Sequence, residues 1–168
     1  MPDDTLTLEG AIPTDWPAIQ ALLQEAGLPT DGMAEHLATA LVVRGPEGVV
    51  ACGALELYGE SALLRSLAVA PARRGEGLGQ RLVHALLSQA RERGVRRVTL
   101  LTETAGAFFP RFGFRPIPRQ EVDPAVQASL EFSHLCPESA QAFLWEAGDG
   151  KMRSGESGRR DRRLEIRD

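Results

Sequence analysis

The feature that most constrains this chain is the order strand, glycine-rich turn, helix, strand between residues 62 and 101. Residues 62–69 form an apolar run suited to a buried strand, and the turn 74–79 follows shortly after. From Leu78 to Ala90, apolar residues recur four apart, which predicts a helix packed on a sheet. Residues 98–101 are a second short apolar run. Two strands joined through a helix form a crossover, so we predict that they are parallel.

The segment before this crossover predicts an antiparallel meander. Residues 41–44 and 49–57 are strand-like and flank a Pro/Gly turn, and Gly59–Glu60 separates the second of them from residues 62–69. We therefore predict an α/β fold with one mixed sheet, in which the meander precedes the βαβ crossover. The shorter expected elements are strands at 6–8, 113–116 and 140–144 and helices at 31–39, 104–111 and 124–130, with another helix between the candidate caps Thr14 and Asp15 and Gly27.

Composition narrows the class of protein. The 168 residues suit one domain, predicted at 1–147, followed by a polar, charged and flexible tail at 148–168. The net charge of −4 argues against nucleic acid as a partner. The chain has no signal-like start and no apolar run long enough for a bilayer, which favours a cytoplasmic protein without a membrane partner. Cys52 and Cys136 lack metal-like spacing and are expected as free thiols, so we expect no metal.

The turn Arg74-Gly75-Glu76-Gly77-Leu78-Gly79 has the composition of a phosphate-binding loop. Backbone N–H groups in the first turn of a helix are unpaired and lie at the positive end of the helix dipole. Glycines leave those groups open to a phosphate, and Arg73 and Arg74 add positive charge. The alternative is a tight connection that needs glycine for positive φ. A P-loop is excluded because no Gly-Lys-Ser/Thr follows.

Two motifs in order resemble the GNAT N-acetyltransferase superfamily. The first is Arg74-x-x-Gly77-x-Gly79, preceded by residues 67–71, and the second is Ala105-x-x-Phe108-Phe109 with Gly113-Phe114. The resemblance covers about residues 6–144. It implies acetyl-coenzyme A (acetyl-CoA) as co-substrate and a sheet splayed open between residues 63–69 and 98–102.

The resemblance also implies where the cofactor lies. Pantetheine is expected to pair with the backbone of Leu67 and Val69, and pyrophosphate is expected to rest on the amides of residues 74–79. The expected cofactor-binding residues are Leu67, Ala68, Val69, Arg74, Gly75, Glu76, Gly77, Leu78, Gly79, Phe108 and Phe109.

Further stretches resemble a narrower branch, the acetyltransferases associated with arsenic-resistance operons. These are residues 55–59, 62–67, 100–105 and 131–140. The branch implies that the acetyl group passes to the amine of a small molecule, for which the glutamate mimics arsinothricin and phosphinothricin are candidates.

Amide formation from a thioester needs a neutral amine, a polarised carbonyl and a proton for the departing thiolate. Many GNAT enzymes use a tyrosine as that donor, but the matching position here is Phe109. Glu56 is the candidate base, with a solvent-exposed strand residue as the alternative. Tyr58 lies on the same strand face and is a candidate to donate a proton or to orient, unless it is only structural.

Arg65 lies between Leu64 and Ser66 in the strand that lines the expected gap. It is a candidate to pair with a substrate carboxylate, and an internal ion pair with a nearby glutamate is the alternative. Ser66, Thr102 and Thr104 are candidate substrate-binding residues, and backbone capping by their hydroxyl groups explains them equally well. His36 and His134 have no evident partner in the sequence.

Two other functions stay open at this stage. One is a peptide or protein N-acetyltransferase, and the other is a non-catalytic acyl-CoA-binding sensor, which the phenylalanine at position 109 keeps in consideration. The sequence leaves both a monomer and a homodimer open.

Overall fold

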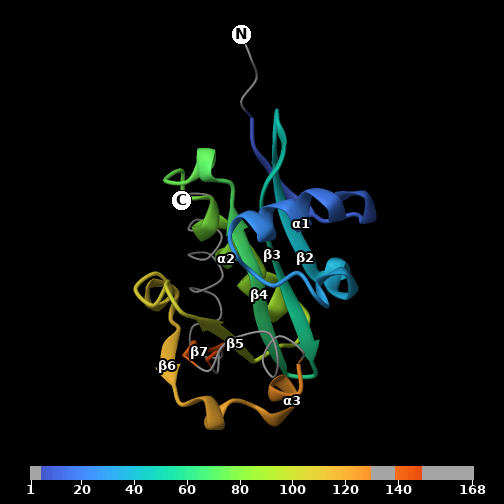
Figure 1. Ribbon diagram of the computed structural model, residues 1–168. Helices are drawn as coiled ribbons and strands as arrows, with labels where there is room; N and C mark the ends of the chain where they lie inside the picture. The colour runs from blue at the N-terminus through green and yellow to red at the C-terminus, as the bar shows by residue number, and fades with distance from the viewer. Residues whose placement is uncertain (1–4, 130–138, 149–168) are drawn as a thin grey trace.

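A computed structural model of the chain describes residues 5–129 and 139–148 (Figure 1). The strands are β1 (Thr7–Gly10), β2 (Ala40–Gly45), β3 (Gly48–Tyr58), β4 (Ser61–Val69), β5 (Arg97–Thr102), β6 (Arg115–Ile117) and β7 (Gln141–Glu146). The α-helices are α1 (Trp16–Glu25), α2 (Leu78–Glu92) and α3 (Pro124–Gln127). Short 3-10 helices are η1 (Pro13–Asp15), η2 (Met33–Thr39), η3 (Pro71–Arg73), η4 (Phe109–Phe112) and η5 (Arg119–Glu121).

All described strands belong to one mixed sheet with the order β1-β2-β3-β4-β5-β7-β6. The predicted meander is confirmed, because β2, β3 and β4 pair antiparallel in sequence. The predicted crossover is also confirmed, because β4 and β5 are parallel neighbours joined through α2. The fold class expected from the sequence is therefore correct.

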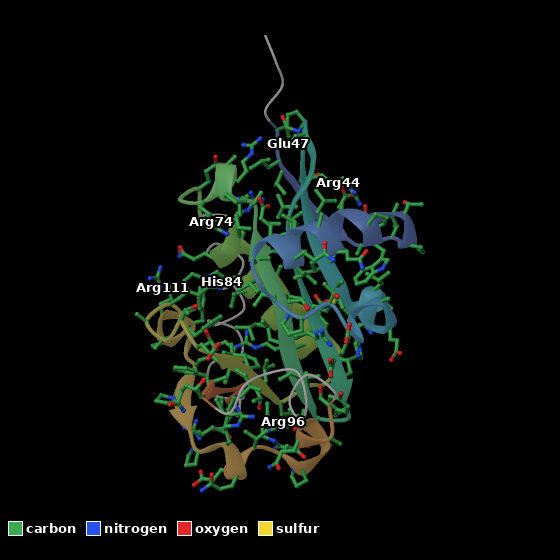
Figure 2. All side chains as sticks on the ribbon, in the orientation of Figure 1. Arg44, Glu47, Arg74, His84, Arg96 and Arg111 are labelled. Carbon is green, nitrogen blue, oxygen red and sulfur yellow. The ribbon has the colours of Figure 1, made fainter. Side chains whose placement is uncertain are left out.

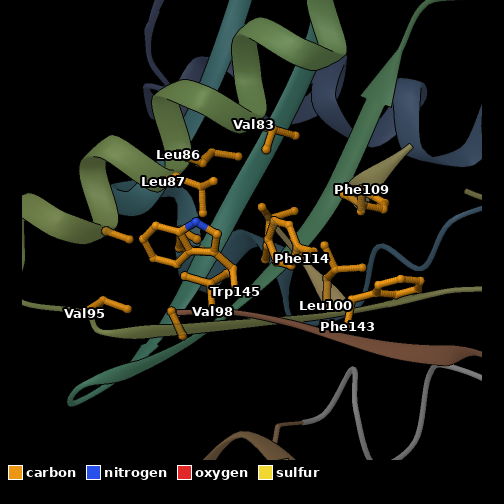
Figure 3. Close-up of a cluster of buried hydrophobic side chains, with 14 residues drawn as sticks. Val83, Leu86, Leu87, Val95, Val98, Leu100, Phe109, Phe114, Phe143 and Trp145 are labelled. Atoms are coloured by element: carbon orange, nitrogen blue, oxygen red, sulfur yellow. The ribbon is translucent and has the colours of Figure 1, made fainter. Parts of the chain in front are cut away.

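The two faces of this sheet carry different helices. Figure 1 shows α1 in front of β2, β3 and β4, and α2 behind them. On β3, Ala54 packs in the cluster that includes α1, whereas its neighbour Leu55 packs in the cluster under α2. Figure 3 shows Val83, Leu86 and Leu87 of α2 above the strands in that second cluster. Successive side chains of β3 therefore point to opposite faces of the sheet, and each face carries its own hydrophobic core.

The sheet opens between β4 and β5. Their pairing covers only Ser61–Leu63 against Arg97–Thr99, at one end of both strands. Beyond that point β4 keeps its pairing with β3 but has an irregularity, because two residues between Arg65 and Ala68 oppose the single residue between Cys52 and Ala54. Ser66 in this bulge has φ 61°, which is a strained conformation for a serine. The expected splay is present, and a bulge lies at its edge.

Two predicted helices differ from the structure. Residues 104–111 are not one helix, since only Phe109–Phe112 form a 3-10 turn. Proline has no N–H group, so Pro110 is suited only to a first helical turn. Residues 31–39 give η2, a 3-10 segment that starts at Met33 and has non-helical backbone angles at His36.

Other details of the expected elements also change. Asp15 makes no side-chain cap on α1, because its carboxylate accepts from the Ile12 N–H and from Arg44 instead. Cys52 is a buried free thiol, as expected. Cys136, His134, most of the 131–140 stretch and the 149–168 part of the predicted tail lie outside the described residues.

Candidate functional site

The splay between β4 and β5 opens into a cavity of about 930 Å³. Its walls come from residues 64–69 of β4, the loop 73–80, residues 100–111 and the segment 26–29 after α1. Figure 2 shows Arg74 and Arg111 on the same side of the molecule as His84 of α2. The predicted site residues that line the cavity are Arg65, Ser66, Leu67, Ala68, Val69, Arg74, Gly75, Glu76, Gly77, Leu78, Gly79, Thr102, Thr104, Phe108 and Phe109. Glu56 and Tyr58 are not among its lining residues.

The N-terminus of α2 faces this cavity. Gly77 is the N-cap residue, no side chain caps the helix, and the N–H of Arg81 donates to the Gly77 carbonyl at 3.1 Å. The N–H groups of Leu78, Gly79 and Gln80 precede that first intrahelical bond and line the cavity. They meet the requirement for binding a phosphate, since the helix dipole adds to their partial positive charge.

The three glycines of the loop are needed for different reasons. Gly75 and Gly77 have φ 88° and 82°, so the alternative explanation from the sequence, a connection that needs positive φ, applies to both. A Cβ at Gly75 would point into open space. Gly79 lacks a positive φ, and a Cβ there would make ordinary contacts, 3.5 Å from Phe108. Backbone conformation therefore does not explain glycine at 79, which favours close approach of a ligand.

Arg73 does not present a free charge to this loop. Its side chain is 10% exposed and donates to both carboxylate oxygens of Glu47 and to Glu76. The expectation that Arg73 contacts phosphate is therefore not supported. Arg74 is exposed, and its Nε donates to the Val69 carbonyl at 3.3 Å.

A buried polar cluster lies beside the cavity, on the face of the sheet opposite α2. Glu56 is 2% exposed, and its Oε1 accepts from the hydroxyl groups of Tyr58 and Ser129 at 2.5 and 2.6 Å. Its Oε2 accepts from Arg65 at 2.7 Å and lies 3.5 Å from Nε2 of His36. Glu56 is thus not the solvent-exposed strand residue considered as an alternative. Sequence reasoning missed His36 and Ser129 as its partners.

These contacts bear on acid–base chemistry. Burial alone would raise the pKa of Glu56, but hydrogen bonds from Ser129, Tyr58 and Arg65 lower it below its ordinary value. Burial and the hydrogen bond to Glu56 raise the pKa of Tyr58 to about 12. A carboxylate with a lowered pKa is a weak base, and a phenol with a raised pKa is a weak acid. The geometry favours structural and orienting roles for both.

Arg65 is enclosed, with no exposed side-chain area. Besides Glu56, its guanidinium donates to the Ser66 hydroxyl at 3.0 Å and to the Asp31 carbonyl at 3.0 Å. The internal ion pair, given from the sequence as the alternative to substrate binding, is what the structure contains. Arg65 borders the cavity as part of a neutral pair that fixes the bulge at Ser66.

Aromatic and hydroxyl groups complete the other wall. Phe109 is 5% exposed and packs edge-on against Phe108 and Phe114, with centroids 5.0 and 5.7 Å away. The guanidinium of Arg111 lies 5.1 Å from the Phe108 ring centroid. Thr102 Oγ1 accepts from the Ala105 N–H at 3.0 Å, as the capping alternative predicted. No phenol reaches this wall, because Tyr58 is the single tyrosine of the chain.

Residues 36–116, which include the loop, α2 and the cavity walls from β4 and residues 100–111, match the acetyltransferase (GNAT) domain family. Over these residues the chain is similar to a GNAT acetyltransferase domain. The match agrees with the superfamily expected from the sequence for that part of the chain. Within residues 5–129 and 139–148, no three His, Cys, Asp or Glu side chains form a potential metal site. In the same residues, no helix has the length and apolarity that a membrane span requires.

Known proteins with a similar sequence or fold align with different portions of this chain. An amino-acid acetyltransferase of Mycobacterium tuberculosis is 40% identical over 90 residues, which are 52% of this chain and 48% of that protein. The chain thus spans about half the length of this curated relative. The structure of Rv2747 from Mycobacterium tuberculosis, in complex with CoA and NLQ, is 25% identical with a TM-score of 0.68, covering 83% of this chain and 98% of the other.

A third likeness is to a larger enzyme. The N-acetylglutamate synthase of Neisseria gonorrhoeae, complexed with coenzyme A and N-acetyl-glutamate, superposes with a TM-score of 0.72. It is 20% identical and covers 86% of this chain but 35% of the synthase. At that identity the likeness concerns the fold, which agrees with the mixed sheet and its splay.

Proposed function

We propose that this protein transfers the acetyl group of acetyl-CoA to the primary amine of a small, amino-acid-like acceptor. One observation carries the proposal. A single cavity extends from the unpaired N–H groups at the start of α2, along the unpaired edge of β4, to the bulge at Ser66. A phosphate at one end and a reacting thioester at the other require this extended shape.

The residues present fit acetyl-CoA. The loop 74–79 offers N–H groups and glycines without Cβ atoms. Among the described residues, the edge of β4 beyond Leu63 has no strand partner on the side of β5. We propose that the pyrophosphate is held at residues 74–79 and that pantetheine pairs with the backbone of Leu67 and Val69. Phe108, Phe109 and Ala68 line the same path and are proposed to contact the cofactor.

The chain's own contribution to the chemistry is mainly positioning. Acetyl-CoA supplies a thioester carbonyl for attack by the neutral amine, with the amine proton passing to water and the leaving thiolate protonated by water. Ser66, Thr102 and Thr104 are proposed to contact the acceptor or the carbonyl. Through the Arg65 pair, Glu56 holds the bulge beside that carbonyl, and Tyr58 orients Glu56.

The finer proposal is that the acceptor is acidic, as glutamate and its mimics arsinothricin and phosphinothricin are. Arg65 and Arg73 line the cavity but are each paired with carboxylates, so the positive charge that favours an anionic ligand comes from Arg74 and Arg111. The resemblance to arsenic-resistance acetyltransferases adds to this, as do an amino-acid acetyltransferase and an N-acetylglutamate synthase among the similar proteins.

Turnover of acetyl-CoA with a panel of amines tests the proposal. The panel contains glutamate, arsinothricin, phosphinothricin, neutral and basic amino acids, and short peptides. Release of free thiol is followed together with the mass of the acetylated product. We expect thiol release with the acidic amino acids. Acetylation of peptides alone would favour a peptide acetyltransferase, and CoA binding without thiol release on any amine would favour a sensor.

A further inference from the structure

Arg73 connects the loop 74–79 to a distant hairpin. Its Nε and Nη2 donate to the two oxygens of Glu47 at 2.8 and 2.9 Å, and its Nη1 donates to Glu76 at 3.2 Å. Glu47 lies in the turn between β2 and β3, whereas Glu76 lies within the loop itself. Figure 2 labels Glu47 and Arg74 in the same upper part of the molecule. One guanidinium therefore ties two segments that are distant in sequence.

The backbone of the hairpin is shaped to admit this guanidinium. A Cβ at Gly45 would lie 3.2 Å from Nη2 of Arg73 and 2.9 Å from Oε1 of Glu47. Both separations are tighter than ordinary Cβ contacts, so a side chain at 45 would displace the ion pair. Gly45 has no positive φ that would require glycine. A Cβ would also lie 2.9 Å from Cδ2 of Leu6, so the position needs space both for the Arg73–Glu47 pair and for Leu6.

The charges here do not favour attraction of a phosphate by Arg73. Two carboxylates flank one guanidinium, so this group of three side chains has a net charge of −1 when all are ionised. The hydrogen bond from Arg73 also lowers the pKa of Glu47 to about 2, so that carboxylate is ionised near neutral pH. The negative charge of Glu47 repels a nearby pyrophosphate. Any contribution of Glu47 to cofactor binding must therefore come from the geometry that it imposes on Arg73.

We infer that Glu47 is a positioning residue that acts through Arg73 and holds the loop 74–79 in the conformation that aims its backbone N–H groups at the pyrophosphate of CoA. The inference rests on the proposed function. Bidentate contact with a carboxylate fixes the orientation of a guanidinium as well as its place. Arg73 directly precedes Arg74, so fixing its side chain restrains the entry into the loop.

The test compares Glu47→Gln with Glu9→Gln in the full chain. Glu9 is a matched control, since it is 47% exposed against 48% for Glu47 and also accepts from an arginine Nε at 2.8 Å. Calorimetry gives the Kd for CoA, for 3′-dephospho-CoA and for pantetheine, which lacks the pyrophosphate. We expect Glu47→Gln to raise the Kd about fivefold for CoA and for 3′-dephospho-CoA, an effect of about 1 kcal/mol. The Kd for pantetheine should not change. Glu9→Gln should leave all three Kd values unchanged.

The sign of the change separates the explanations. If Arg73 were a phosphate ligand masked by Glu47, Glu47→Gln would release it and tighten CoA binding, which would overturn the inference. An equal loss for pantetheine would overturn it as well. Gly45→Ala keeps every charge and displaces the pair, so it should also weaken CoA binding. Thermal unfolding verifies that each variant is folded.

A failure of the proposed function has a different signature. If the wild-type protein bound none of the three ligands, the proposed function and this inference would both be overturned. If the wild type bound CoA and Glu47→Gln bound it equally well, only the inference would be overturned. Hydrogen exchange of the amides of residues 75–79 in the free protein adds a readout that needs no ligand, and it should accelerate in Glu47→Gln but not in Glu9→Gln.

Discussion

Nη1 of Arg65 donates to Oε2 of Glu56 at 2.7 Å, and both side chains are almost completely buried. The pair joins neighbouring strands, because Ala54 lies opposite Arg65 and Glu56 lies opposite Leu63. It holds β4 immediately before the Ser66 bulge. The end of the cavity at Ser66 is thus built on a buried charge pair rather than on a free cation.

Removal of one charge from this pair should be costly. We expect Glu56→Gln to lower the free energy of unfolding by about 3–5 kcal/mol, because Arg65 then keeps a buried charge without a countercharge. Urea denaturation monitored by circular dichroism measures the change. The double variant Glu56→Leu/Arg65→Met removes both charges and should recover more than half of the loss. A Glu56→Gln protein within about 0.5 kcal/mol of the wild type would show that the pair contributes little.

The role of the single tyrosine can be separated from acid catalysis. We expect Tyr58→Phe to lower stability by about 1 kcal/mol, the usual effect of losing one hydrogen bond. Its kcat should fall no more than about threefold, since the raised pKa makes Tyr58 a weak proton donor. Steady-state kinetics across pH provides the measurement. A loss of about a hundredfold in kcat, the scale of general acid catalysis, would instead assign proton transfer to Tyr58.

The free energy of unfolding should decrease as the pH falls into the acidic range. Hydrogen bonds lower the pKa of Asp15, chiefly from Arg44, and the pKa of Asp123, chiefly from Ser61; the pKa of Glu56 is also lowered. Carboxylates with lowered folded-state pKa values contribute stability that is fully present above their unfolded values of about 4. That stability is lost as the pH falls through the lower folded values.

Urea midpoints measured from pH 7 down to pH 2 check this dependence. The midpoint should be nearly constant from pH 7 to about 5 and decline below about pH 4. Asp15→Asn should be less stable than the wild type at pH 7 and show a shallower decline. Identical slopes for the two proteins would mean that Asp15 does not contribute through its ionised form.

Two glycines of the loop should respond differently to alanine. Gly77→Ala places a Cβ on a residue with φ 82° and should lower stability by about 1–2 kcal/mol. Gly79→Ala lies in the first turn of α2 and should leave stability unchanged or raise it by up to about 1 kcal/mol. We nevertheless expect Gly79→Ala to raise the Kd for CoA about tenfold, or about 1.4 kcal/mol. Unchanged CoA affinity in that variant would argue against phosphate at the N-terminus of α2.

Periodicity was sufficient to predict the meander and the crossover, whereas the opening between β4 and β5 was expected from the family resemblance. The register of the β3–β4 hairpin, set by the two residues between Tyr58 and Ser61, contained the signal for the Arg65–Glu56 pair. Diagonal neighbours on one sheet face are close enough for long side chains to meet. The contacts of His36 with Glu56 and of Glu47 with Arg73 carried no such local signal. They join segments 20 or more residues apart and depend on the folded structure.

An open sheet normally has two outer edges, here β1 and β6. Because β4 and β5 pair only over Ser61–Leu63 and Arg97–Thr99, the described sheet has two further edges in its interior. Unpaired strand edges are templates for the wrong partner, which proteins usually cover. A cofactor that lies along β4 would close one of these edges as a missing strand does. A bound cofactor would then protect the protein against self-association as well as supply an acetyl group.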